Sequence, residues 1–134
     1  MNKPTSFTSQ PRAEGQLCID IGGGSQIEML YQQGASKVLF PRQLNGKQAI
    51  YINTSGGLTS GDSFTTEIKS KGDAQFTFTT QGFERVYRST DGRCAKIRNT
   101  LHITEQASCH WLPQETLFYD EEALFQHFIE LTEG

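Results

Sequence analysis

The sequence predicts an all-β protein, organised as a solenoid-like two-layer stack of antiparallel strand pairs. Three observations lead to this prediction. Short runs alternate between apolar and polar residues, which is typical of half-buried strands. Turns rich in glycine separate many of these runs. An apolar pattern also recurs at an offset of 33 residues, and repeats of this length indicate strand pairs that bury their faces on one another.

The first strands of the stack follow a polar N-terminal segment. Residues 1–14 contain two prolines and no periodicity, so we expect a mobile lead-in there. Apolar residues then alternate with polar ones over Leu17–Ile21, which predicts a half-buried strand. A glycine turn at residues 22–25 leads to a partner strand over Ile27–Tyr31. A simple hairpin explains this region, and we assign it no chemistry.

Two further strands lead to the most unusual part of the chain. Lys37–Phe40 is a strand that ends at Pro41, because proline cannot donate to a sheet and restricts the residue before it. Residues 48–53 form another strand, and Phe64–Ile68 forms the one after. Between these last two lies a stretch of ten residues that is rich in glycine and hydroxyl groups, Asn53-Thr54-Ser55-Gly56-Gly57-Leu58-Thr59-Ser60-Gly61-Asp62.

This glycine stretch is longer than a turn between two strands requires, because a tight hairpin needs only two special residues. The spacing of Gly56 and Gly61 matches a phosphate-binding loop. However, Asp62 stands where that loop needs a lysine, and a carboxylate repels phosphate. No helix pattern follows to supply a positive N-terminal dipole either. We therefore reject a nucleotide site here.

An apolar pattern in the second half of the chain occurs twice, and a third copy begins near the end. Each full copy contains a strand, a polar turn and a second strand. In the third copy Ile129 corresponds to Leu101, so we expect a strand over Phe125–Leu131 rather than the short helix that its spacing also allows. The full copies read Ile68-x5-Ala74-x-Phe76-x-Phe78-x2-Gln81 and Leu101-x5-Ala107-x-Cys109-x-Trp111-x2-Gln114.

The third copy stops at its turn, so we expect the chain to be incomplete. The strand over Phe125–Leu131 would then have no following strand to cover it. An exposed strand edge is a template for pairing with another chain. We therefore expect the isolated chain to self-associate edge to edge.

Composition excludes several classes of function. The net charge is −3 and no basic block occurs, which argues against a nucleic-acid partner. No apolar run reaches membrane length, and the N-terminus has no signal-peptide pattern. The three cysteines are widely spaced, which favours reduced thiols and a cytoplasmic location over a disulfide framework.

Residue spacing alone identifies no active site. The cysteines and histidines match no metal-binding motif, and Cys109 and His110 should lie on opposite faces of a strand. Two alternatives stay open at this point. One is a sugar- or ligand-binding β-module, which would need an exposed aromatic platform such as Tyr31, Tyr51 and Tyr87 on one face. The other is an uncharacterised enzyme, which would use Glu84, Glu115 or Cys109 in a deep pocket.

Three sequence blocks resemble the UreD/UreH family of urease accessory proteins, and their order and spacing agree with that family from about residue 14 to the end. The first joins Leu39-Phe40-Pro41 to the glycine stretch Asn53-Thr54-Ser55-Gly56-Gly57-Leu58-Thr59-Ser60-Gly61-Asp62. The second joins Thr79-Thr80-Gln81 to Val86-Tyr87-Arg88-Ser89, and the third is Trp111-Leu112-Pro113-Gln114-Glu115-Thr116.

The resemblance implies a β-superhelical scaffold with no catalysis of its own. It implies that residues 15–134 are the N-terminal part of a UreD-like β domain, since family members are about twice this length. It also implies partners and a cargo: the urease apoprotein, the accessory protein UreF, through UreF the GTPase UreG, and nickel that is carried transiently to urease. No tightly bound cofactor is expected.

Three carboxylates are candidates for a nickel path through such a scaffold. Nickel accepts carboxylate and imidazole ligands, and a path must hold the ion weakly enough to release it. Asp62 closes the glycine stretch, Glu115 follows Pro113, and Glu84 lies among arginines that could hold it in place. The alternative for Asp62 is structural, because it could instead cap its own loop by accepting backbone N–H groups.

Overall fold

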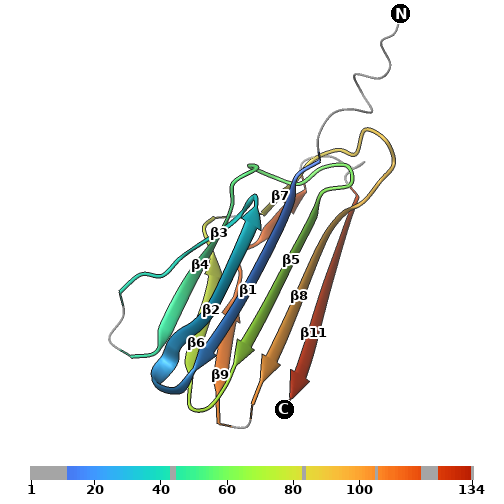
Figure 1. The fold of residues 1–134 in the computed structure, drawn as a ribbon. Coiled ribbons are helices and arrows are strands. Elements are labelled where there is room, and N and C mark those ends of the chain that lie inside the picture. The colour runs from blue at the N-terminus through green and yellow to red at the C-terminus, as the bar shows by residue number, and fades with distance from the viewer. Residues whose placement is uncertain (1–11, 43–44, 83, 105, 119–123, 134) are drawn as a thin grey trace, which may run out of the picture.

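The structure is a computed structural model, and it describes residues 12–42, 45–82, 84–104, 106–118 and 124–133. Within these ranges every regular element is a strand, apart from one turn of 3-10 helix, η1 (Gly23–Ser25). The prediction of an all-β fold is therefore confirmed (Figure 1). No helix among the described residues has the length and apolar character needed to cross a membrane.

The strands form three sheets. From one edge to the other, the large sheet contains β11 (Phe125–Glu133), β8 (Ala95–Ile103), β5 (Ser63–Ser70), β1 (Glu14–Gly22) and β2 (Gln26–Gly34). The facing sheet contains, in the same manner, β3 (Ser36–Leu39), β4 (Lys47–Asn53), β6 (Gln75–Thr80) and β9 (Ser108–Leu112). The small sheet contains β10 (Thr116–Phe118) and β7 (Glu84–Val86).

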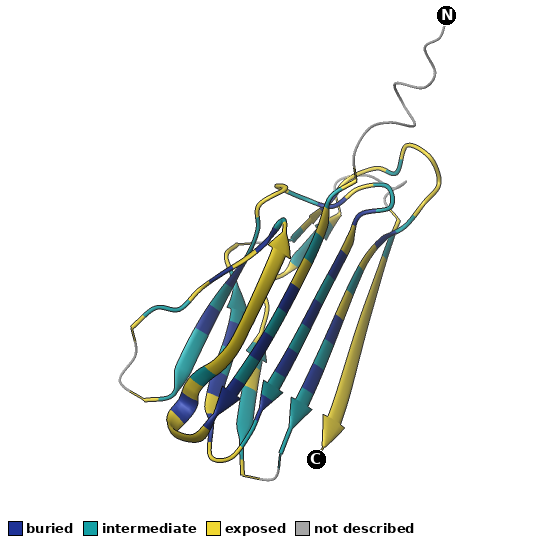
Figure 2. Cartoon of the chain, viewed as in Figure 1, coloured by how far each residue is buried: buried dark blue, intermediate teal, exposed yellow. Residues whose placement is uncertain are grey.

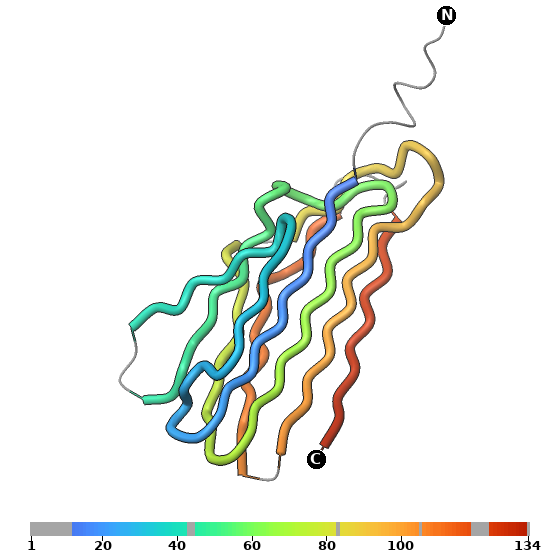
Figure 3. Tube along the Cα trace, in the orientation of Figure 1, coloured from blue at the N-terminus to red at the C-terminus, as the bar shows by residue number. Residues whose placement is uncertain are grey.

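The internal repeat is visible in the sheet register. The first copy lies on β5 and β6 and the second on β8 and β9, so each copy supplies one strand to the large sheet and one to the facing sheet. The strands that follow the two copies, β7 and β10, pair in the small sheet. Ile68 lies beside Leu101 in the large sheet, and Phe76 lies beside Cys109 in the facing sheet, as the offset predicts. Equivalent strands therefore stack side by side (Figure 3), and they run in the same direction, as the arrows in Figure 1 show.

The predicted antiparallel pairing is wrong for these copies. β5 and β6 do not pair with each other but lie in different sheets, and β5–β8, β6–β9 and β7–β10 are parallel. Antiparallel pairing occurs at β1–β2 and β3–β4. The inward faces of β5 and β6 carry Phe64 and Ile68, and Phe76 and Phe78, so placing the strands in opposite layers buries these apolar side chains between the sheets. The two layers are thus present, whereas the solenoid itself stays a prediction.

The third copy differs from its predicted register by two residues. β11 is a strand, as expected, and it pairs in parallel with β8. Leu131 lies beside Leu101, whereas the prediction placed Ile129 there. A shift of two residues keeps the same side chains on the inner face, because the side-chain period of a strand is two. Sequence alternation therefore cannot detect it.

The core lies between the large sheet and the facing sheet. Leu17, Ile19 and Ile21 of β1 are fully buried, and Phe76 of β6 packs into the same cluster. Figure 2 shows the alternation of buried and less buried residues along β1, β5 and β8. A second, smaller cluster, nearer the glycine stretch, contains Leu58, Phe64, Val86 and Ala95.

The two long edges of the stack differ. At one edge, the Val38 backbone N–H of β3 donates to the Gln32 side chain of β2 at 3.1 Å, which ties the two layers together. At the other edge β11 is largely exposed, and Leu131 keeps 68% of its surface in solvent (Figure 2). The outer side of β11 has no partner strand in the part of the chain that the structure describes. Pairing of this edge with another chain stays a prediction.

The predicted lead-in is shorter than residues 1–14. Residues 1–11 lie outside the described residues, so the expected mobility of that segment stays a prediction. Glu14 is already the first residue of β1. The Ala13 side chain packs against the smaller core cluster, and its backbone N–H donates to Asp62. These last two residues of the segment are therefore part of the β domain.

Candidate functional site

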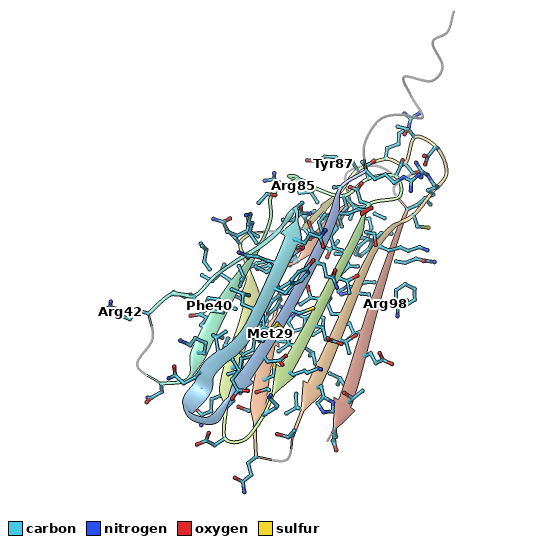
Figure 4. All side chains as sticks on the ribbon, in the orientation of Figure 1. Met29, Phe40, Arg42, Arg85, Tyr87 and Arg98 are labelled. Atoms are coloured by element: carbon cyan, nitrogen blue, oxygen red, sulfur yellow. The ribbon has the colours of Figure 1, made fainter. Side chains whose placement is uncertain are left out.

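Parts of the three sequence blocks singled out above meet at one end of the molecule, whereas Leu39-Phe40-Pro41 lies away from it at the other end of β3. The glycine stretch, which we call the glycine loop (residues 53–62), exchanges backbone hydrogen bonds with the chain around Val86: Leu58 N–H donates to the Arg85 carbonyl and Tyr87 N–H donates to the Leu58 carbonyl. The third block joins through the Glu84 N–H, which donates to the Glu115 carbonyl at 3.0 Å. Figure 4 shows Arg85 and Tyr87 at this end.

Side chains at the start of the glycine loop hold its turn. The Asn53 side-chain oxygen accepts the Ser55 backbone N–H at 2.9 Å and also the Ser55 hydroxyl. The Thr54 backbone N–H and hydroxyl both donate to the Ala35 carbonyl, which fastens the loop to the end of β2. Gly56 has φ of 88°, a left-handed conformation that costs glycine little.

Gly57 is required for a different reason, since its conformation is ordinary but its surroundings are crowded. A β-carbon built at Gly57 would lie 2.4 Å from the Tyr87 ring and 3.1 Å from the Arg85 carbonyl oxygen. The tyrosine ring therefore packs directly on the backbone of the loop. Tyr87 and Gly57 act together as a structural contact between two of the blocks.

Asp62 is buried and its carboxylate is engaged on both oxygens. One oxygen accepts the Ala13 backbone N–H at 3.0 Å, and the other accepts the Thr59 backbone N–H at 2.9 Å. The Asp62 backbone N–H and carbonyl are bonded as well, to Thr59 and Lys96. This geometry is that of the capping role expected as the alternative for Asp62. A role of the same carboxylate in binding nickel stays a prediction.

The Glu84 carboxylate, in contrast to that of Asp62, accepts a bond from one side-chain amide and none from the backbone among the described contacts. Glu84 begins β7 and is half buried, and burial raises the pKa of its carboxyl above the ordinary value. The Asn53 side-chain amide donates to Glu84 Oε2 at 3.4 Å, which lowers the pKa in part. From the sequence, Arg85 or Arg88 was expected to hold Glu84 in place. The contact that the structure shows comes instead from the glycine loop.

Two hollows lie on either side of Glu84. An inner cavity of about 50 Å³ extends between the sheets, and an outer pocket of about 170 Å³ opens toward the glycine loop. Both are lined by the same three residues, Tyr51, Thr80 and Glu84. A volume of about 50 Å³ holds a few water-sized groups. Glu84 is therefore the carboxylate that borders both hollows at this end of the molecule.

Glu115 does not share this position. Its side chain is exposed, and only its backbone carbonyl contacts Glu84. The neighbouring residues Pro113, Gln114 and Thr116 line the inner cavity instead. The Gln114 backbone N–H donates to the Thr80 hydroxyl at 2.9 Å, which holds this segment against β6. The third block thus lines the cavity with the neighbours of Glu115 and not with the predicted residue Glu115 itself.

The inner cavity contains polar groups that sequence reasoning missed. His127 of β11 lines it, and the His127 Nε2 lies 2.8 Å from the Asn99 side-chain nitrogen. Burial lowers the pKa of His127, which favours the neutral imidazole. The Trp111 indole N–H is buried and has no acceptor among the described residues. Asn99 and His127 occupy inward positions in otherwise apolar alternations, and that signal could have revealed them.

The two alternatives left open by the sequence receive little support. Tyr31 lies on the exposed side of the large sheet, Tyr51 is buried between the sheets, and Tyr87 packs on the glycine loop, so they form no shared platform. The three residues of the enzyme hypothesis do not share the cavity: Glu84 lines it, while Glu115 and Cys109 do not.

Cys109 packs against the core in register with Phe76, as predicted, and burial raises the pKa of its thiol to about 11. His110, its neighbour in β9, is exposed. Among the residues that the structure describes, no three His, Cys, Asp or Glu side chains lie close enough to hold a metal ion.

The fold is a two-layer β structure in which one half-buried carboxylate, Glu84, borders two hollows. A fold by itself does not define a function. Comparison with known proteins identifies the family. The model of the UreD urease accessory protein family matches residues 12–133. The chain belongs to this family, which confirms the resemblance drawn from the three blocks.

Individual relatives agree with the family match. The chain is 39% identical to the urease accessory protein UreD of Ruegeria pomeroyi over 105 residues, which cover 78% of this chain and 41% of that protein. It is 40% identical to the UreD of Brucella suis over 123 residues, with 90% and 44% covered. It is 35% identical to UreD 1 of Methylobacterium radiotolerans over 132 residues, with 94% and 46% covered. The chain spans less than half the length of these relatives.

Proposed function

We propose that this chain acts in urease maturation as a non-catalytic cytoplasmic scaffold. In this role it binds the urease apoprotein and UreF, is linked through UreF to UreG, and helps to deliver nickel to the urease active site. Membership of the family supports the maturation role, and its relatives carry the name of accessory proteins. Three free cysteines are compatible with a reducing compartment.

The observation that carries the nickel part of the proposal is the position of Glu84. Its carboxylate borders both the outer pocket and the inner cavity, and its only described side-chain bond is a long one to Asn53. Nickel accepts carboxylate and neutral imidazole ligands, and His127 offers an imidazole in the same cavity. Two separated ligands would hold an ion more loosely than a closed four-ligand site, as transfer requires.

The other two candidate carboxylates have smaller parts in this proposal. Both Asp62 oxygens already accept backbone N–H groups, so a nickel ion would have to compete with those bonds. The Glu115 side chain is exposed and could meet an ion only outside the cavity. We therefore rank Glu84 first among the predicted nickel-path residues, and we retain Asp62 and Glu115 as weaker candidates.

Partner capture in a urease-producing cell tests the scaffold role. The tagged chain should recover apo-urease and UreF, whereas nickel added to the purified proteins should not by itself bring them together. Glu84→Gln should recover the same partners but lower urease activation severalfold. Glu67→Gln, on the outer side of β5, is the matched control and should leave both properties unchanged. Recovery of neither partner by the wild-type chain would overturn the proposal.

A further inference from the structure

Asn53 is the one glycine-loop residue whose side chain reaches both the loop and Glu84 in the described structure. Its two functional atoms are used separately. The side-chain oxygen accepts the backbone N–H and the hydroxyl of Ser55. This assignment leaves the amide nitrogen facing Glu84 Oε2, to which it donates at 3.4 Å. The turn at Ser55 therefore fixes the direction in which the amide group points.

The bond from Asn53 meets Glu84 where the two hollows adjoin. Asn53 itself lines the outer pocket, together with Gly56, Gly82 and Arg85. Behind Glu84 the inner cavity continues toward Asn99, Trp111 and His127. The Tyr51 hydroxyl is close enough to feel the Glu84 charge, but it is engaged with the Ser36 hydroxyl at 2.8 Å. Asn53 is thus the donor that sets where the Glu84 carboxylate lies.

We propose that Asn53 is the positioning residue of Glu84, and that it holds the carboxylate at the junction of the outer pocket and the inner cavity. A divalent cation that moves between the two hollows then passes within reach of this carboxylate. The role rests on the proposed function in nickel delivery and adds to it the residue that controls how Glu84 is presented. In this proposal the first residue of the glycine loop has two roles, to hold the turn at Ser55 and to position Glu84.

A purely structural role for Asn53 makes different predictions, because the two atoms can be altered separately. Asn53→Ser keeps a hydroxyl that can accept the Ser55 N–H in a related turn, but this side chain is too short to reach Glu84. Asn53→Asp keeps the acceptor for Ser55 and places a second carboxylate oxygen beside Glu84. If Asn53 positions Glu84, Asn53→Ser should therefore weaken cation binding, whereas it should leave binding unchanged if Asn53 only holds the turn. Asn53→Asp should tighten binding and shows that this position is within reach of the ion.

The test is a titration of the 134-residue chain with Ni²⁺ at constant pH, monitored by calorimetry and by NMR. Paramagnetic Ni²⁺ should broaden the backbone amide signals of Tyr51, Thr80 and Glu84 in the wild-type chain. Glu84→Gln should abolish this broadening. Asn53→Ser should weaken the Kd by about threefold to tenfold, the range that corresponds to the net value of an ordinary hydrogen bond. Asn53→Asp should tighten it by a similar factor, because two carboxylates then face the ion.

Thr54→Ala is the matched control, because Thr54 is in the same loop and its hydroxyl bonds only the Ala35 carbonyl among the contacts described. Its Kd should stay within about twofold of the wild type, as for a surface change away from the site. If Glu84→Gln abolishes binding but Asn53→Ser behaves like Thr54→Ala, the positioning role is wrong and the proposed function stands. If the wild-type chain shows no broadening at these amides, or Glu84→Gln retains it, the nickel part of the proposed function fails as well.

Discussion

Asp62 and Glu84 lie at the same end of the molecule, but their carboxylates differ in how fully they are hydrogen-bonded. Asp62 accepts one backbone N–H on each oxygen, and its own backbone is also bonded. Glu84 has one long bond from a side-chain amide and faces two hollows. A buried carboxylate that is satisfied by backbone donors stabilises the fold, whereas one that is left partly unsatisfied beside a cavity keeps capacity for a cation.

The largest expected effect is on the Asp62 side of this contrast. Asp62→Ala removes the acceptor of two part-buried hydrogen bonds, those from the Ala13 and Thr59 N–H groups, and each such loss costs about 1–3 kcal/mol. We therefore expect the free energy of unfolding to fall by roughly 2–4 kcal/mol. Urea unfolding followed by circular dichroism measures it.

Asp73→Ala provides the control for Asp62→Ala. Asp73 also accepts a backbone N–H, from Gly24 at 2.9 Å, but this bond is exposed. Its loss should cost only about 0.5–1 kcal/mol, the net value of an ordinary hydrogen bond. Equal costs for the two variants would show that Asp62 is no more structural than a surface aspartate, and would return it to the nickel-path candidates on equal terms with Glu84.

A smaller effect is expected from filling the contact between the glycine loop and Tyr87. Gly57→Ala places a β-carbon 2.4 Å from the Tyr87 ring, so the ring must move. Overpacking of this kind destabilises by about 1–3 kcal/mol. Gly23→Ala is the matched change, because the nearest atom to a β-carbon there is 3.8 Å away and φ is not left-handed. A thermal shift for Gly57→Ala no larger than for Gly23→Ala would mean that the loop yields easily.

The smallest expected effect is a gain in stability rather than a loss, and it comes from replacing Glu84. Because burial raises its pKa, the native chain holds a proton that the unfolded chain has already released, in the pH range between the ordinary and the raised value. Stability therefore falls as pH rises through that range, and the loss is complete above it. Glu84→Gln lacks this loss, so its Tm at neutral pH should exceed that of the wild type by about 2 °C.

The pH profile provides the check on this last prediction. The advantage of Glu84→Gln should disappear below the ordinary glutamate pKa, where the wild-type carboxyl is protonated in both states. Glu67→Gln should show no comparable gain at neutral pH, since Glu67 lies on the outer side of β5 and borders neither hollow. A destabilised Glu84→Gln at neutral pH would mean that the ionised form is favoured in the fold and that Glu84 resembles Asp62 after all.

The strands themselves could be located from the sequence because their cause is local. Alternation at Leu17, Ile19 and Ile21 places one face of β1 in the core, and the structure buries all three. The repeat offset also correctly predicted which residues lie side by side, as Ile68 with Leu101 shows. The family could be identified for a similar reason, since each of its motifs is a short run of neighbouring residues that can be recognised without the fold.

Strand direction and cavity membership were decided only by the tertiary structure. An alternating run has the same period whether its neighbour is parallel or antiparallel, so the sequence could not show that β5 and β8 run together. The cavity lining raises a related difficulty, because alternate residues of an extended segment face opposite sides. Gln114 and Thr116 line the cavity, and Glu115 between them does not. The amide of Asn53 reaches Glu84 across 31 positions of the chain. Such a contact depends on how the layers pack, and no local pattern encodes it.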